Sequence, residues 1–391
     1  MQIILILKSI LIFSFILGLI VLLHELGHYI AARLTGCKVE AFAFGFGPSI
    51  LKKKKGDTDY RWNLIPLGGY CQIMGESRDV NDPSSLSSKN PVQKLFVFSA
   101  GVLMNIVLAI FAYTLYLSFT NFQTYIPQLP DIQTNFVGVQ EEIVNKPLIT
   151  DILADTPALE SGMQPEEFLW AVDAIEIRSI DQFKDYLQDK FGQTVTLKTL
   201  SPYEQGYKEY KLYLDYKDEE GKVLAGFGNN PSTGFYILNY SQNKVFSGFA
   251  HTLNISKYTI GSIRYLISES KAQDSLEPIS QGTGTILKAG EITYKYVKGD
   301  KFLEIVNLLA GISLSVGILN ILPIPPLDGG HILVLFVEII TRRKMPDKWK
   351  SIIFNLFFAL LMLLFVVMLI KDVKTSDIGI VKSTLEKLHL K

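Results

Sequence analysis

The sequence predicts a polytopic α-helical membrane protein that also carries a soluble α+β domain. One observation is that four apolar stretches approach the roughly 20 residues that a helix needs to cross a bilayer, in a chain of 391 residues of which 48% are hydrophobic. Another is that a long segment between the second and third stretches alternates short β-type runs with turn signals. Together the two patterns indicate membrane spans joined by a domain that folds outside the lipid.

The expected organisation follows from these stretches. Spans are expected at 1–34, 95–119, 302–322 and 351–371. Between and after them we expect a first loop at 35–94, a linker at 120–134, the α+β domain at 135–230, an amphipathic or linker region at 231–301, a Pro-rich loop at 323–350 and a tail at 372–391. The first span is too long for a cleaved signal peptide, and no small-residue cleavage site precedes its polar cluster.

Loop charges predict the orientation of the chain. The first loop contains the run Lys52 to Lys55, and the loop at 323–350 is also rich in lysine and arginine. Both loops are therefore expected on the cytoplasmic side under the positive-inside rule, with both termini and residues 120–301 outside. The formal net charge of the whole chain is zero. We accordingly expect a lipid bilayer, and no nucleic acid, among the partners.

The two cysteines, Cys37 and Cys71, are too few for a disulfide framework. Both fall in the first loop, where thiols are expected to stay reduced. We interpret them as small buried residues rather than as metal ligands.

The strongest functional signal is the segment His24-Glu25-Leu26-Gly27-His28 in the first span. On a helix, positions i and i+4 share a face, so the two imidazoles can bind one Zn²⁺. The glutamate between them can act as general base toward a water on that metal. Ionisable residues inside a span are costly and point to function. The competing interpretation is a helix end whose polar side chains reach the membrane surface.

A catalytic zinc site needs a third protein ligand and one open position. We favour Asp328, because three prolines just before it open the backbone at the end of the third span. Irregular backbone at that depth is tolerated only where protein or a water-filled cavity surrounds it. The first and third spans run in the same direction, so Asp328 and the histidines reach the same side of the bilayer. His331 is the alternative third ligand.

Several separated motifs together resemble the site-2 protease family of intramembrane zinc metalloproteases, in its bacterial branch with a single PDZ domain. In chain order the motifs are His24-Glu25-x-x-His28, Phe44-Gly45-Phe46-Gly47-Pro48, Pro66-Leu67-Gly68-Gly69-Tyr70, Ala100-Gly101-x-x-x-Asn105 and Asn320-x-x-Pro323-x-Pro325-x-Leu327-Asp328-Gly329-Gly330. The resemblance covers nearly the whole chain.

The resemblance implies one Zn²⁺ per chain, bound by His24, His28 and Asp328, with Glu25 activating water. It implies that Asn320 holds the substrate or stabilises the oxyanion, as an amide N–H can do. It also implies a membrane-associated β-element within 35–94 that pairs with an unwound substrate, because a helical substrate hides its carbonyls in hydrogen bonds. The implied substrate-binding residues are Gly45, Gly47, Gly68, Gly69 and Asn105.

The domain at 135–230 resembles a PDZ domain. The matching stretches are Pro147-Leu148-Ile149-Thr150-Asp151-Ile152-Leu153, Asp155-Thr156-Pro157-Ala158 and Ser161-Gly162-Met163-Gln164-Pro165. The predicted fold class is therefore a polytopic α-helical membrane protein of about four transmembrane helices, with a membrane-associated β-element and an extracytoplasmic PDZ-like α+β domain.

The implied function is zinc-dependent endopeptidase activity in the bacterial cytoplasmic (inner) membrane, with the active site toward the cytoplasm. Expected substrates are single-span membrane proteins, such as anti-sigma factors or remnant signal peptides, in regulated intramembrane proteolysis. A different class of function is a PDZ-bearing membrane scaffold with a structural metal, which would favour four protein ligands. A metal transporter would need further ionisable residues along several spans, and the second and fourth spans offer almost none.

Overall fold

The structure is a computed structural model, and the residues it describes are 2–76, 78–129, 134–165, 167–201, 207–218, 220–230, 234–282 and 284–375. The chain divides into two compact units. The first comprises Met1–Tyr113 and Leu266–Lys391, and the second comprises Thr114–Tyr265.

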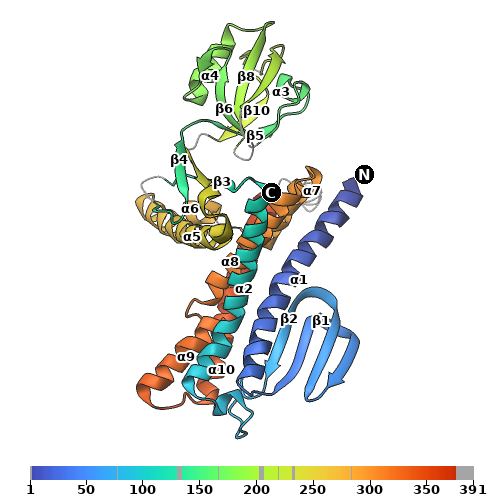
Figure 1. Cartoon of the computed structure of the whole chain (residues 1–391), viewed down its shortest axis with the longest axis vertical. Helices are drawn as coiled ribbons and strands as arrows, with labels where there is room; N and C mark the ends of the chain where they lie inside the picture. The colour runs from blue at the N-terminus through green and yellow to red at the C-terminus, as the bar shows by residue number, and fades with distance from the viewer. Residues whose placement is uncertain are drawn as a thin grey trace. The chain divides into compact units, whose positions relative to one another are not determined.

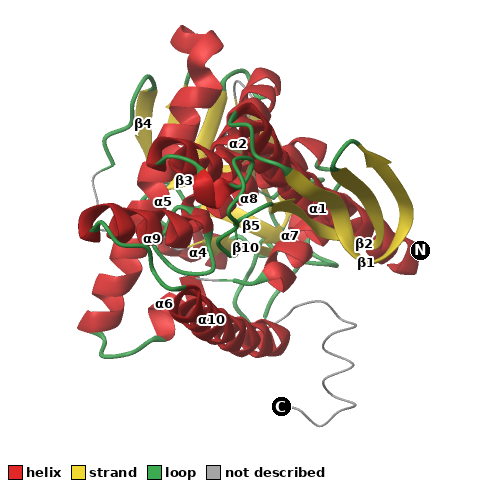
Figure 2. Cartoon of the chain, turned by 90° about the horizontal axis from the view of Figure 1, so that it is seen from below, coloured by secondary structure: helices red, strands yellow, loops and turns green. Residues whose placement is uncertain are grey.

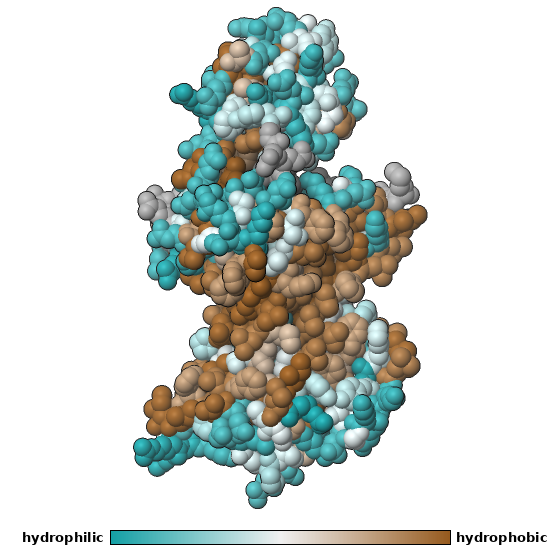
Figure 3. All heavy atoms as spheres, viewed as in Figure 1, coloured by the Kyte–Doolittle hydropathy of each residue, from teal (hydrophilic) through white to brown (hydrophobic). Residues whose placement is uncertain are grey.

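Four helices are long and apolar enough to cross a membrane. They are α1 (Gln2–Leu34), α2 (Pro91–Phe119), α8 (Phe302–Asn320) and α10 (Asp347–Thr375). Their outward side chains are strongly apolar, as the brown surface in Figure 3 shows. A large exposed apolar surface promotes aggregation in water, whereas it is stable in contact with lipid.

Three spanning helices of the first unit pack together through apolar and small residues. Buried Ile16 and Ile20 of α1 contact Leu108 of α2, with Ile312 of α8 against the same cluster. The Ser313 hydroxyl donates a 2.8 Å hydrogen bond to the Asn105 backbone carbonyl, which ties α8 to α2. Small and hydroxyl side chains at such contacts let helices approach closely inside a membrane.

The predicted Pro-rich loop at 323–350 is not a loop throughout. It contains the helix α9 (Asp328–Thr341), because the apolar run after the glycines can continue a helix once the prolines are passed. The region at 231–301 likewise contains regular elements. These are η2 (Ser241–Phe246), α5 (Ser247–Ala272), α6 (Glu277–Gly282) and α7 (Ile286–Lys298), after the strand β11 (Phe235–Asn239). The short helix η1 (Leu86–Ser88) precedes α2.

The first loop folds into a curled β-element beside α1 (Figure 1). Its strands are β1 (Val39–Lys55) and β2 (Thr58–Ile73). Phe44 pairs with Gly69 on one side and with Trp62 on the other, while Leu51 also pairs with Trp62. Each strand is therefore bent back on itself. The four segments lie in the order 49–55, 58–65, 39–46 and 69–73, which leaves 69–73 at one edge.

Glycines permit these bends. Gly45 and Gly47 have φ of +81° and +85°, a region that is cheap only for glycine. A Cβ at Gly45 would lie 2.4 Å from the Ile65 carbonyl oxygen. The same close approach of backbones explains Gly69, whose Cβ would lie 2.6 Å from the Ala43 carbonyl oxygen. The backbone conformation and packing of the β-element therefore require glycine at these positions, whether or not they also bind substrate.

The second unit contains two antiparallel sheets, shown as yellow strands in Figure 2. The larger has the order β10-β5-β6-β8-β9, with β7 paired to β6. Its strands are β5 (Leu148–Ile152), β6 (Glu167–Val172), β7 (Ile175–Glu176), β8 (Thr194–Leu200), β9 (Tyr207–Tyr213) and β10 (Phe227–Asn230). The helices α3 (Pro157–Glu160) and α4 (Ile180–Gln188) accompany it, and Leu169, Phe183 and Leu197 are buried in its core.

The smaller sheet changes the expected boundaries. It has the order β3-β11-β4, with β3 (Gln123–Pro127) and β4 (Gln140–Val144) on either side of β11. The predicted linker at 120–134 therefore contains a strand. The predicted domain at 135–230 includes β4, which pairs with β11 outside that range rather than with the larger sheet. Buried residues alternate along β3, and Phe235, Tyr236 and Leu238 of β11 are buried, so both strands contribute apolar side chains to the core.

Candidate metal centre

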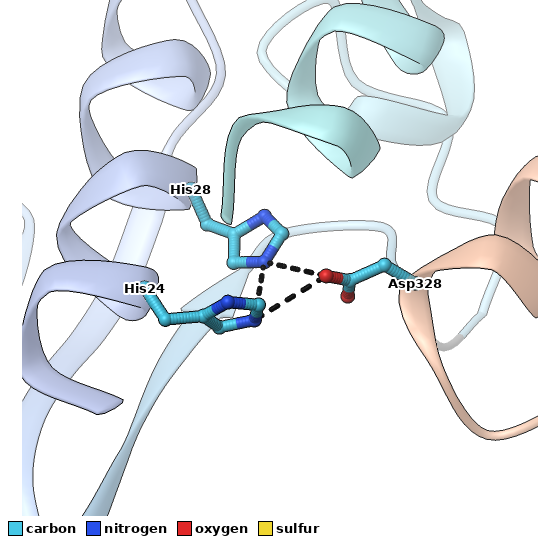
Figure 4. A group of neighbouring side chains, drawn as sticks. All are labelled: His24, His28 and Asp328. Atoms are coloured by element: carbon cyan, nitrogen blue, oxygen red, sulfur yellow. Dashed lines mark hydrogen bonds and ion pairs between the residues drawn. The ribbon is translucent and has the colours of Figure 1, made fainter. Parts of the chain in front are cut away.

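Three side chains from two distant parts of the chain converge at one point (Figure 4). His24 and His28 project from α1, and Asp328 projects from the first turn of α9. The two histidine Nε2 atoms are 3.3 Å apart. The Asp328 Oδ2 atom lies 3.3 Å from Nε2 of His24 and 3.4 Å from Nε2 of His28. Among the described residues, this is the one group of this kind that could hold a metal ion.

These separations fit a tetrahedral zinc ion. Nitrogen and oxygen ligands at 2.0–2.1 Å from a tetrahedral centre lie about 3.3–3.4 Å from one another. The three separations of 3.3, 3.3 and 3.4 Å between the ligand atoms form such a triangle. The buried Oδ2 of Asp328 has no hydrogen-bond partner of its own. Two imidazoles and one carboxylate are the donor set of a catalytic zinc site, which leaves a fourth position open.

The second ring nitrogen of His28 fixes its tautomer. Nδ1 lies 2.9 Å from the Val97 carbonyl oxygen of α2. A carbonyl can only accept, so Nδ1 carries the proton and Nε2 presents its lone pair toward Asp328. Outer hydrogen bonds of this kind orient metal-binding histidines and raise their basicity.

Asn105 of α2 performs the corresponding role for His24. Its side-chain amide lies 3.2 Å from Nδ1 of His24, and the residue is completely buried. The amide oxygen has no partner when the NH₂ group faces the ring. With the amide turned by half a rotation, Oδ1 accepts from Nδ1–H and His24 Nε2 is free for a metal. The predicted role of Asn105 toward substrate stays a prediction, whereas its side chain in this structure is enclosed against His24.

Gly101 of α2 lies directly over the ligand atoms. A Cβ there would be 2.3 Å from Nε2 of His28 and 2.7 Å from Nε2 of His24. Gly27 of α1 faces the same helix, and its Cβ would lie 2.4 Å from the Ala100 carbonyl oxygen. The two glycines thus allow α1 and α2 to meet at the metal-binding residues. The motif Ala100-Gly101-x-x-x-Asn105 did not by itself predict a role for Gly101. Its spacing of four from Asn105, one helical turn, was the available signal.

Glu25 lies on the side of α1 that faces the curled β-element. A Cβ at Gly69 would be 3.7 Å from Cγ of Glu25. The backbone amide of Cys71 also interacts with the Glu25 carboxylate. The edge segment 69–73 and a general-base candidate are therefore adjacent, beside the two histidines.

The comparisons with known proteins agree with this geometry. The model of the family described as "Peptidase family M50" matches residues 12–364. The chain belongs to this peptidase family. A relative from Clostridium acetobutylicum named "Putative zinc metalloprotease" is 27% identical over 91% of this chain and 94% of its own. One of the same descriptive name from Campylobacter jejuni is 29% identical over 85% of this chain and 84% of its own.

A solved structure also matches part of the M50 chain. It is the PDZ domain of the SdrC-like protein from Listeria monocytogenes, covering 25% of this chain and 93% of its own at 18% identity and a TM-score of 0.19. A TM-score this low adds nothing to the description of the fold. The family match and the four apolar helices make the chain a membrane protein of a metalloprotease family.

The remaining predicted residues of the M50 chain fall in different places. His331, the alternative ligand, stacks on Phe98 and packs edge-on against Phe354, with ring centroids at 5.1 and 4.6 Å. Burial lowers its pKa to about 4, and it is not among the converging ligands. Asn320 is the last residue of α8, and its predicted role toward substrate stays a prediction. Gly68 has φ of +90°, and a Cβ there would overlap the Phe46 ring at 2.3 Å.

Proposed function

We propose that this chain is a zinc-dependent endopeptidase that cleaves transmembrane segments of single-span membrane proteins. The main support for this proposal is the triangle of His24, His28 and Asp328, whose ligand atoms are spaced as tetrahedral zinc requires. The histidines lie within an apolar helix long enough to cross a bilayer. A peptide bond cut here therefore belongs to a substrate segment at membrane depth.

The proposed chemistry divides between the metal and the chain. Zinc, when bound, supplies a Lewis acid that polarises the scissile carbonyl and makes water acidic. Glu25 removes the proton from the attacking water and delivers it to the departing amine. Val97 and Asn105 hold the imidazoles in the tautomers that binding requires.

The edge segment 69–73 gives the substrate a place to unfold. It pairs with 39–44 on one side, and an added strand on its other side would run past Glu25. Such pairing supplies the backbone hydrogen bonds that a substrate helix loses when it opens. Gly69 keeps side-chain bulk away from the approach to Glu25. By family resemblance, Asn320 is assigned to holding the substrate or stabilising the oxyanion.

A four-ligand structural site is the competing explanation. Among the residues that the structure describes, no fourth histidine, cysteine or carboxylate joins the cluster. Buried Cys37 packs instead with Val39, Ile73 and Leu86. An open position favours catalysis over scaffolding.

The decisive test replaces Glu25 by glutamine. We expect Glu25→Gln to abolish cleavage of a single-span membrane substrate while the protein remains folded and retains zinc. A matched control is Glu141→Gln in β4, an exposed residue of the second unit, and full cleavage is expected there. Undiminished cleavage by Glu25→Gln would remove Glu25 as the base.

We also propose that the larger sheet of the second unit is an extracytoplasmic PDZ-like domain that excludes substrates with bulky external parts. Deleting residues 146–230 removes that sheet but keeps both β4 and β11. Cleavage of an untrimmed substrate by the deleted protein is the expected result. If the deleted protein still cleaves only trimmed substrates, the filter proposal fails.

A further inference from the structure

A pocket lined mainly by apolar side chains lies between α1 and the curled β-element. The pocket there has a volume of about 680 Å³, within the range of about 300–1,000 Å³ that is usual for small-molecule sites. α1 lines it with Leu11, Phe15, Leu19 and Leu22. Phe44 and Trp62 line it from β1 and β2. All of these residues belong to the first unit.

The pocket is distinct from the metal centre. Its lining positions on α1 recur every three or four residues and therefore share one face. His24 follows Leu22 by two residues, which turns it about 200° around the helix axis. An occupant of the pocket is thus separated from the metal ligands by α1 itself.

The pocket runs along the membrane-spanning direction of α1. At one level, a Cβ at Gly18 would lie 3.2 Å from the Phe44 ring. At another, the hydroxyl of Tyr60, also a lining residue, lies 2.7 Å from that of Tyr29. Gly18 and Tyr29 are about 16 Å apart along the helix, at 1.5 Å per residue. Since Leu11 and Phe15 also line it, the pocket extends from the N-terminal half of the span, past Gly18, toward the His28 end.

The two ends of the pocket differ in charge. Lys53 lines it and pairs with Tyr60, so it lies at the His28 end. Lys55 is two positions further along and shares that face of the strand. Among the described residues, neither lysine has an ion-pair partner, whereas Lys52 pairs with Asp59. An apolar channel thus ends in uncompensated positive charge.

We propose that this pocket binds an anionic phospholipid from the leaflet at the His28 end of α1. One acyl chain lies along Phe15 and Leu19, and the phosphate lies at Lys53. A free anion would match only the charged end, and an apolar peptide segment only the other. Basic residues beside a span attract anionic lipids, and Trp62, which packs against Phe44 at the level of Gly18, lies beside the acyl chain rather than the headgroup.

The experiment uses Trp62 as the reporter. The full-length chain has three tryptophans, so Trp170→Phe and Trp349→Phe leave Trp62 alone in the pocket. This protein is placed in phosphatidylcholine bilayers with a minor fraction of phosphatidylglycerol, brominated on the acyl chains of either lipid at equal mole fraction. Brominated phosphatidylglycerol is expected to quench Trp62 more strongly than brominated phosphatidylcholine.

The preference for phosphatidylglycerol should depend on the face of β1 that carries Lys53. Lys53→Glu is expected to abolish it, and the milder Lys53→Gln to weaken relative binding about fivefold, the effect of one basic residue near an anionic surface. Lys54→Glu, on the opposite face, is the matched control and should retain most of it.

Three outcomes would overturn the proposal. Equal quenching by the two lipids shows that the pocket does not select charge. A preference that survives Lys53→Glu places the headgroup elsewhere, and absence of quenching by either lipid shows that a protein segment fills the pocket. All measurements are made in the Glu25→Gln background, so their failure leaves the proposed peptidase activity untouched.

Discussion

Gly101 faces His28 so closely that a Cβ atom at position 101 would lie 2.3 Å from the Nε2 nitrogen. No real Cβ contact is that short, and Nε2 is also the atom that points at Asp328. The absence of a side chain on α2 is therefore part of the metal centre, although Gly101 itself offers no ligand.

The first prediction concerns this glycine. Gly101→Ala should lower zinc affinity by at least about tenfold, because the methyl group must displace both imidazoles from their positions. The control is Gly311→Ala in α8, where a Cβ would make an ordinary 3.6 Å contact with the Tyr113 hydroxyl. Competition with a zinc chelator measures both variants. Equal affinity of Gly101→Ala and wild type would contradict the close packing.

A second prediction concerns the amide beside His24. Asn105→Leu should lower zinc affinity by about 10–100-fold, since Nδ1–H of His24 then loses its acceptor. Asn105→Asp keeps an acceptor oxygen at the same place and should retain zinc. If both variants bind zinc alike, Asn105 does not act through the tautomer of His24. Competition with the same chelator measures the zinc affinity of both variants.

Metal removal provides the third prediction. Chelation should lower the thermal unfolding midpoint of the wild type, since a ligand bound only by the folded state stabilises it by about 1.4 kcal/mol per tenfold excess over its dissociation constant. The midpoint of His24→Ala should not respond to chelator. The zinc-free wild type should remain folded, because Ile16, Ile20 and Leu108 hold the helices together without the metal.

The fourth prediction is a pH effect remote from the metal centre. His251 of α5 is buried, and its Nδ1 lies 3.0 Å from the Tyr240 hydroxyl, which itself accepts from Asn254 and so donates to the ring. Burial lowers the pKa of His251 from 6.5 to about 3. The unfolded chain therefore takes up this proton first as the pH falls, and stability is lost below about pH 6.5 by about 1.4 kcal/mol per unit.

His251→Gln keeps an acceptor for Tyr240 but cannot titrate. Its thermal midpoint should fall less steeply than that of the wild type between pH 6.5 and pH 5, as read by calorimetry at matched ionic strength. Carboxylates titrate in both proteins, so the difference between the two curves isolates the histidine. Parallel curves would show that His251 is not kept neutral by the fold.

Much of the metal centre was predictable because its parts are local patterns. The spacing of His24 and His28 places both on one helix face whatever surrounds them. Asp328 followed from the prolines before it and from the direction of the third span. The structure also distinguishes the two candidate third ligands, because Asp328 and not His331 lies with the two histidines. The sequence left both open, since each can bind zinc and only three residues separate them.

Other features needed the tertiary structure. Asn105 lies 81 residues from His24, and a polar residue in a span can face substrate or a neighbouring side chain with equal reason. The helix α9 was missed because prolines and glycines suggest a loop, whereas the apolar run behind them continues as helix. The pairing of β3 with β11 joins residues more than 100 positions apart, and no short-range pattern indicates it.

The central claim is that α1 and α9 share one zinc ion, and metal analysis of purified protein tests it most directly. We expect about one zinc per chain in the wild type and far less in both His24→Ala and Asp328→Asn, because removing either corner of the triangle leaves too few ligands. Full zinc occupancy in Asp328→Asn, under conditions where His24→Ala has lost the metal, would contradict it.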